Sequence, residues 1–183
     1  MPPSGQMTAS ELDELLREGK LAGTWVLDAS RSEVRLLSKT MWGLVSVKGV
    51  FGRIEGSGTV SPAGEASGTI TVASESIDTK MKRRDEHLRS ADFFDAANHP
   101  SIIFTADQVR PSGKGVTVTG SLTVRGRTRP MSFDAQASSV DGSEVSLDGE
   151  VQVDRTDFGL TWNQMGMAGV NNTITVHAVF TRQ

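Results

Sequence analysis

From Trp25 onward, apolar and polar residues alternate along the chain with a period of two. The alternation is clearest over residues 116–124, 131–137, 145–153 and 174–180. Segments of this kind are typical of antiparallel strands that have one face against a core and the other against water. Candidate strands lie near 25–39, 45–54, 55–61, 66–79, 102–110, 116–125, 127–140 with 144–154, and 173–182. The pattern therefore predicts an all-β protein with about eight antiparallel strands.

Turn signals and glycines favour a sheet that closes into a barrel. Asp141-Gly142 is a favoured hairpin dipeptide. Many of the 19 glycines lie within or beside the predicted strands, where glycine often marks the bulges and bends of a curved sheet. A barrel of about eight strands is either filled by its own side chains or holds one ligand. A β-sandwich is the alternative.

Two short helices interrupt the strand pattern. Residues 1–7 are predicted to be disordered, and residues 8–19 form a helix, since Thr8 and Glu11 have capping-box spacing and Leu12 begins an apolar face. A second, highly charged helix is predicted near 82–90. The 183 residues suit one domain, and we place the barrel domain at 23–183.

Composition excludes several classes of protein. The net charge of −3 gives no basic excess for nucleic acid. The chain has no cysteine, which rules out disulfides and thiolate chemistry. No apolar run approaches the ~18 residues of a membrane span. The first residues have no basic start and no apolar core, so we find no secretory signal and expect a cytoplasmic protein unless a leader preceded Met1.

The sequence shows no clear catalytic or metal-binding motif. His87, His99 and His177 have no close ligand spacing. There is no Gly-x-Ser-x-Gly elbow and no phosphate-binding loop. We therefore predict no metal, no cofactor and no enzymatic activity. A weaker hypothesis is an enzyme that acts on a hydrophobic substrate near His87 and Asp95.

The segment 83–95 is the strongest candidate for function, because a charged helix there runs directly into Phe93-Phe94. One interpretation is that its charges fix the helix to the barrel rim while the phenylalanines pack in the core. The other is that the phenylalanines line a cavity and Arg84, His87 or Arg89 meets a ligand headgroup, since Arg suits phosphate. The candidate cavity residues are Trp42, Phe51, Phe93, Phe94, Phe104, Phe133, Trp162, Met165 and Met167, and core packing is the alternative for each.

The stretch from Arg84 to Asp95, with Pro100 and Phe104 after it, closely resembles the signature of the YceI-like family of lipid-binding proteins. Residues 120–126 and 155–159 resemble later motifs of that family. The resemblance covers about residues 23–182. It implies a lipocalin-like antiparallel barrel with an elongated apolar interior that binds long polyisoprenoids, with homodimers common and no catalytic residues.

Three places depart from the family pattern. Arg31 and Lys39-Thr40-Met41-Trp42 stand where the family often has histidine, and residues 163–167 and Asn171-Asn172 replace more typical loop residues. The resemblance therefore leaves the ligand open between a polyprenyl phosphate and an isoprenoid quinone. Our leading hypothesis is a soluble carrier of such lipids. The alternative is a ligand-free, stress-related or partner-binding barrel with a filled interior.

Overall fold

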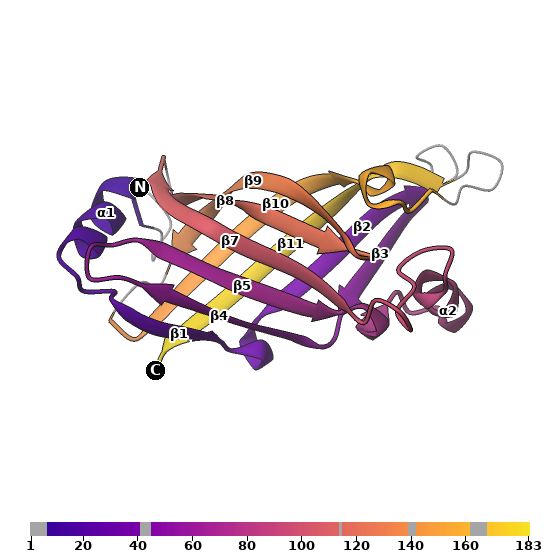
Figure 1. Cartoon of the computed structure of the whole chain (residues 1–183), viewed down its shortest axis with the longest axis horizontal. Coiled ribbons are helices and arrows are strands. Elements are labelled where there is room, and N and C mark those ends of the chain that lie inside the picture. The colour runs from indigo at the N-terminus through magenta and orange to yellow at the C-terminus, as the bar shows by residue number, and fades with distance from the viewer. Residues whose placement is uncertain (1–6, 41–44, 114, 139–141, 162–167) are drawn as a thin grey trace.

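The chain folds into an elongated antiparallel β-barrel with one helix at each end (Figure 1). The computed structural model describes residues 7–40, 45–113, 115–138, 142–161 and 168–183. The strands are β1 (Gly23–Leu27), β2 (Glu33–Thr40), β3 (Val45–Phe51), β4 (Ile54–Val60), β5 (Ala66–Ala73), β6 (Ile77–Asp78), β7 (Ser101–Ser112), β8 (Gly115–Val124), β9 (Arg127–Ser138), β10 (Glu144–Asp154) and β11 (Ala168–Arg182). The helices are α1 (Ala9–Arg17) and α2 (Lys82–Arg89), and short 3-10 turns are η1 (Ala29–Arg31), η3 (Ser74–Ser76) and η4 (Arg155–Phe158).

The barrel closes through the pairing of β1 with β11. Within the described part of the chain, the closed ring runs β1-β4-β5-β7-β8-β9-β10-β11, which is eight strands. β2, β3 and β6 continue the sheet from the edge of β11. The predicted all-β antiparallel barrel is thereby confirmed, and the sandwich alternative is wrong.

Two of the predicted strands are each broken by a short 3-10 turn. The strand expected over 25–39 is β1 and β2 separated by η1, because the Asp28 carboxylate accepts a hydrogen bond from the Ser30 N–H and turns the chain. Both pieces still lie on the same edge of β11. The strand expected over 66–79 is broken at η3, where the Ser74 backbone and hydroxyl both donate to the segment before β7.

Helix α1 covers one end of the barrel. Thr8 caps it: the Thr8 hydroxyl accepts from the Glu11 N–H, and the Glu11 carboxylate accepts from the Thr8 N–H at 2.9 Å. Leu12 and Leu16 of α1 are buried against Trp25 and the strands behind it. The predicted helix at 8–19 is therefore present, two residues shorter at its C-terminal end than expected. Residues 1–6 of the predicted disordered tail lie outside the described residues.

The interior has two apolar clusters that follow one another along the barrel. The cluster toward α1 contains Leu12, Leu16 and Trp25. The cluster toward α2 contains Phe94 and Phe158. Phe104 and Phe180 pack against both clusters, so the apolar interior is continuous from one end of the barrel to the other.

Candidate functional site

A cavity of about 470 Å³ runs along the inside of the barrel. Its lining begins with Leu12 and Leu16 of α1 and extends to Leu88 of α2, at opposite ends of the molecule (Figure 1). The volume lies within the range of about 300–1,000 Å³ that is usual for small-molecule sites. The wall is almost entirely apolar, since the inward positions of nearly every strand carry Val, Leu, Ile, Ala or Phe. The cavity thus suits a long, narrow, apolar ligand.

Five of the phenylalanines named from the sequence lie in the wall of this cavity. The described candidates in the lining are Phe51, Phe93, Phe94, Phe104 and Phe133. They form ring contacts in two places, one at the α2 end between Phe51 and Phe94, with centroids 6.0 Å apart. The other joins Phe104 and Phe133 at 5.4 Å. Trp42, Trp162, Met165 and Met167 lie outside the described residues.

Part of the wall is bare backbone. Gly58 of β4 pairs directly with Gly68 of β5, and both line the cavity. A methyl group on Gly68 would lie 2.7 Å from the carbonyl oxygen of Ser57. Glycine therefore allows the two strands to approach closely here while it adds no side chain to the interior.

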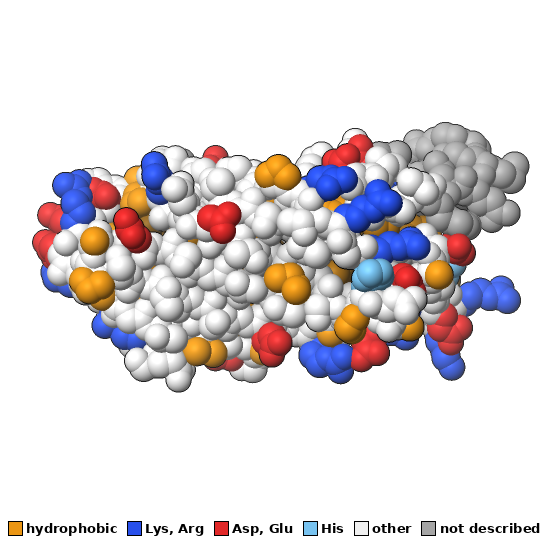
Figure 2. All heavy atoms as spheres, in the orientation of Figure 1, with side chains coloured by type: hydrophobic (Ala, Val, Ile, Leu, Met, Phe, Trp, Pro, Cys, Tyr) orange, Lys and Arg blue, Asp and Glu red, His pale blue; other side chains and the backbone are white. Residues whose placement is uncertain are grey.

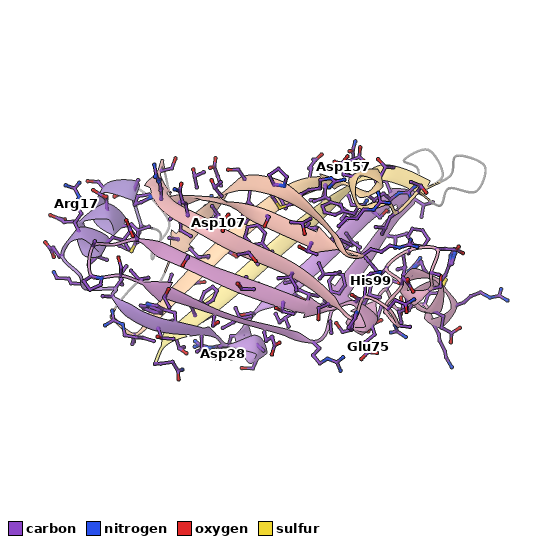
Figure 3. The ribbon with its side chains drawn as sticks, in the orientation of Figure 1. Arg17, Asp28, Glu75, His99, Asp107 and Asp157 are labelled. Atoms are coloured by element: carbon purple, nitrogen blue, oxygen red, sulfur yellow. The ribbon has the colours of Figure 1, made fainter. Side chains whose placement is uncertain are left out.

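The charged and imidazole groups of the lining gather at the α2 end. Among the described lining residues these are Arg84, His87 and Arg155. Arg84 is half-buried; its Nε donates to the hydroxyl of Thr79 and its Nη2 to the carbonyl of Thr79, both at 2.7 Å. The guanidinium is therefore held in place at the edge of the apolar space. In Figure 3, the labelled His99 marks this end and Arg17 the opposite one.

Arg155 is a buried cation that sequence reasoning did not single out. It is 7% exposed, and its Nε and Nη1 donate to the carbonyls of Gly169 and Leu160 at 2.8 and 2.7 Å. Its guanidinium also lies 6.0 Å from the centroid of the Phe93 ring. Burial lowers the pKa of Arg155, which the nearby Asp154 carboxylate partly offsets. The only sequence signal was its place at the head of the 155–159 motif.

Helix α2 is attached to the barrel through its charged residues. The buried Asp85 carboxylate accepts from the N–H and the hydroxyl of Thr79, at 2.9 and 2.5 Å. Arg89 donates to the carbonyl of Ile77 at 3.0 Å and is not among the residues that line the cavity. The contacts of Asp85 and Arg89 support the interpretation that the charges of segment 83–95 fix α2 to the barrel rim. Arg84 takes part in this attachment and also lines the cavity.

The imidazole of His87 lines the cavity next to the phenylalanine pair. It lies 3.2 Å from the carboxylate of Asp92 and makes an edge contact with Phe93, with centroids 5.1 Å apart. Asp95 instead faces Asn98 and His99. In the described residues, no three His, Asp or Glu side chains group as metal ligands. None of the described helices combines the length and hydropathy needed to cross a membrane.

Comparison with known proteins places this architecture in a family. The model of the YceI-like domain matches residues 25–181. A UPF0312 protein of Pectobacterium carotovorum is 40% identical over 67 residues, which are 37% of this chain and 35% of the relative. Protein YceI of Salmonella arizonae is 32% identical over 97 residues, 50% of this chain and 51% of the relative. The chain thus matches only about a third to a half of the length of these relatives.

Solved structures share the fold. Burkholderia cenocepacia BcnA superposes with a TM-score of 0.75 at 24% identity, covering 84% of this chain and 98% of BcnA. A polyisoprenoid binding domain from Saccharophagus degradans, described as implicated in plant cell wall breakdown, superposes with a TM-score of 0.68 at 16% identity, covering 87% and 98%. With a family model that spans the whole barrel and structural neighbours that share its fold, this chain belongs to the YceI-like domain family.

Proposed function

We propose that this protein binds a long-chain isoprenoid lipid inside the barrel, with the tail along the cavity and the headgroup at the α2 end. The observation that carries the proposal is the continuous apolar cavity of about 470 Å³ between α1 and α2. Membership of the YceI-like family supports it, as does the fold shared with a domain named for polyisoprenoid binding.

The size of the hydrophobic contribution makes tail length the main determinant of affinity. Burial of one methylene contributes about 0.8 kcal/mol, so one five-carbon unit contributes roughly 3 kcal/mol before any costs. Ordering of the chain and loss of its free motion reduce this gain. Several buried units are still enough for tight binding without any specialised polar contact.

The polar end of the cavity favours a headgroup that accepts hydrogen bonds. Arg84, His87 and Arg155 are potential donors there. A guanidinium matches phosphate oxygens with paired donors, and it can also donate to a quinone carbonyl. We therefore propose a polyprenyl phosphate or an isoprenoid quinone as ligand, with phosphate favoured by the two guanidinium groups.

The cavity supports a binding protein over the two alternatives. A partner-binding barrel with a filled interior would not need an apolar channel of this length. For an enzyme near His87 and Asp95, the two side chains would have to cooperate. In the structure, His87 pairs with Asp92 while Asp95 faces His99 and Asn98.

A chain-length series tests the proposed function. Purified protein is titrated with polyprenyl phosphates that differ only in the number of isoprene units, and binding is followed by calorimetry. We expect the affinity to rise with each added unit and to level off once the cavity is full. Equal affinity for short and long chains would contradict the proposal, as would binding no tighter than that of isopentenyl phosphate alone.

A further inference from the structure

The start of helix α2 departs from local helix preferences at several adjacent positions. Lys80 has a left-handed backbone with φ of 66°, which is uncommon for a residue other than glycine. Met81 occupies the N-cap and makes no side-chain capping hydrogen bond, although Ser, Thr, Asp or Asn is preferred there. Lys82 and Arg83 follow in the first turn, where the helix dipole disfavours cations. Local preferences are most often broken at sites that serve a function.

Exposed apolar side chains occur at the same end of the molecule. Among the described residues, the large hydrophobic side chains that are exposed are Met81, at 53%, and Val45, at 41%. Val45 begins β3 at the end of the barrel where α2 lies, as Figure 1 shows. Among the described residues, the exposed large hydrophobic side chains therefore lie at the same end of the barrel as the polar end of the cavity.

Charge is distributed unevenly between the two ends. Lys39, Lys82 and Arg83 are exposed at the α2 end, and within the described residues none of them makes a salt bridge. Figure 2 shows Lys and Arg side chains gathered toward this end and projecting from it. Carboxylates at this end include Asp78 and Asp92, which face Lys80 and His87, and the exposed Glu86. The α1 segment instead has an acidic excess, because Glu11, Asp13, Glu14 and Glu18 are opposed there by only two cations, Arg17 and Lys20, which pair with Asp13 and Glu18.

The two ends of the cavity also differ in how tightly they are closed. Leu12 and Leu16, the lining residues of α1, are buried. Arg84, His87 and Leu88, the lining residues of α2, are only half-buried. The lining residues of α2 are therefore more exposed to the surroundings than those of α1.

We infer that the α2 end docks onto a bilayer that contains anionic lipids. Met81 and Val45 enter the headgroup region, Lys39, Lys82 and Arg83 contact the lipid phosphates, and the half-buried end of the cavity faces the membrane. Two exposed apolar side chains beside exposed cations that lack a salt-bridge partner in the described part of the chain suit an interfacial anchor. A stable protein partner would need about 800 Å² of well-packed surface on each side. The role given to docking, which is transfer of an isoprenoid lipid between bilayer and cavity, rests on the proposed function. Docking to the bilayer itself requires no isoprenoid.

Vesicle flotation tests the inference with lipids that contain no isoprenoid. The full chain is mixed with phosphatidylcholine vesicles with or without phosphatidylglycerol. We expect binding only when phosphatidylglycerol is present, weakened by added salt. The double variant Lys82→Glu with Arg83→Glu should lower the partition coefficient by about tenfold or more. The matched control is Arg110→Glu, an exposed residue of β7, and it should bind as the wild type does.

The substitution Met81→Ser distinguishes a loss of membrane docking from a loss of folding stability. Serine is a better N-cap than methionine, so the melting temperature should stay the same or rise, while vesicle binding should fall severalfold. Equal binding to both kinds of vesicle would overturn the inference, as would unchanged binding of the double variant or an equal loss in Arg110→Glu. Capture of an acidic protein without any vesicle binding would also overturn it. Because isoprenoid binding is measured separately by the calorimetric chain-length series, a failure here is distinguishable from a failure of the proposed function.

Discussion

At the scale of single residues, the α2 end of the cavity brings two guanidinium groups into a lining that also holds aromatic rings. Arg155 lies near the Phe93 ring, and Arg84 donates to the hydroxyl and the backbone carbonyl of Thr79. Held in this way, Arg84 loses little conformational freedom when a ligand binds, because its hydrogen bonds already fix its position. Under the proposed function, this arrangement would separate the two parts of recognition, with the rings in contact with the tail and the guanidinium groups near the head.

The substitution Arg84→Gln tests the headgroup role. A charge-assisted hydrogen bond contributes about 1.5–3 kcal/mol, and partial exposure of Arg84 reduces that value. We expect the affinity for a polyprenyl phosphate to fall about tenfold, or about 1.4 kcal/mol, while the affinity for a polyprenol with the same tail stays unchanged. The control is Arg129→Gln on the exposed face of β9. Equal losses for both ligands would mean that Arg84 only braces the helix through Thr79.

The sequence was enough to identify the aromatic residues at the α2 end of the cavity, but not the buried cation Arg155. Phe93 and Phe94 were noticeable because an aromatic pair directly follows a charged helix. Arg155 was not, because its partners are the carbonyls of Leu160 and Gly169, and Gly169 lies 14 residues away. Nothing in the local pattern distinguishes an arginine that is buried by distant backbone from one on the surface. The headgroup roles of Arg84, His87 and Arg89 remain predictions.

At the scale of elements, α1 covers one end of the barrel, and the helix signals in its sequence agree with the way it packs. The capping box satisfies the N–H groups of Thr8 and Glu11, and Leu12 and Leu16 are buried on the face of the helix toward the barrel. Because these signals lie within a few residues of one another, the sequence predicted this element well. The breaks at η1 and η3 were not predicted, since the apolar alternation continues across each short turn.

The capping box predicts a pH dependence of stability. Hydrogen bonds from the Thr8 N–H and then from its hydroxyl lower the pKa of Glu11 below its ordinary value of 4.5. The stabilising contribution of the carboxylate is therefore complete above that value and is lost as the pH falls through the lower pKa of the folded state. We expect Glu11→Gln to lower the free energy of unfolding at neutral pH and to make little difference in strong acid.

Chemical denaturation of both proteins over a range of pH measures this effect. The substitution Glu14→Gln, at an exposed position of the same helix, is the control and should not reproduce the pH dependence. A difference between wild type and Glu11→Gln that stays constant down to strong acid would show that the capping box does not stabilise the folded chain through its charge.

At the scale of the whole molecule, the barrel is polarised along its length. One end is covered by α1 with buried leucines, and the other carries arginines, half-buried lining residues and exposed Met81. The strand pattern and the resemblance to a family were enough to predict a barrel. They did not determine whether its interior was filled or hollow, because that depends on how side chains from many strands meet. Gly58 opposite Gly68 illustrates the point, since their pairing leaves part of the wall without side chains.

The central claim, that the barrel interior holds a long isoprenoid chain, is tested most directly by native mass spectrometry with organic extraction. The wild type is compared with Val176→Trp, which fills the cavity from β11, and with Thr175→Trp on the outer face of the same strand. We predict a discrete long-chain isoprenoid close to one per protein in the wild type and in Thr175→Trp, and a clear loss of it in folded Val176→Trp. A wild-type protein that is empty and also refuses added polyprenyl phosphate and quinone would contradict the account, as would equal occupancy in all three proteins.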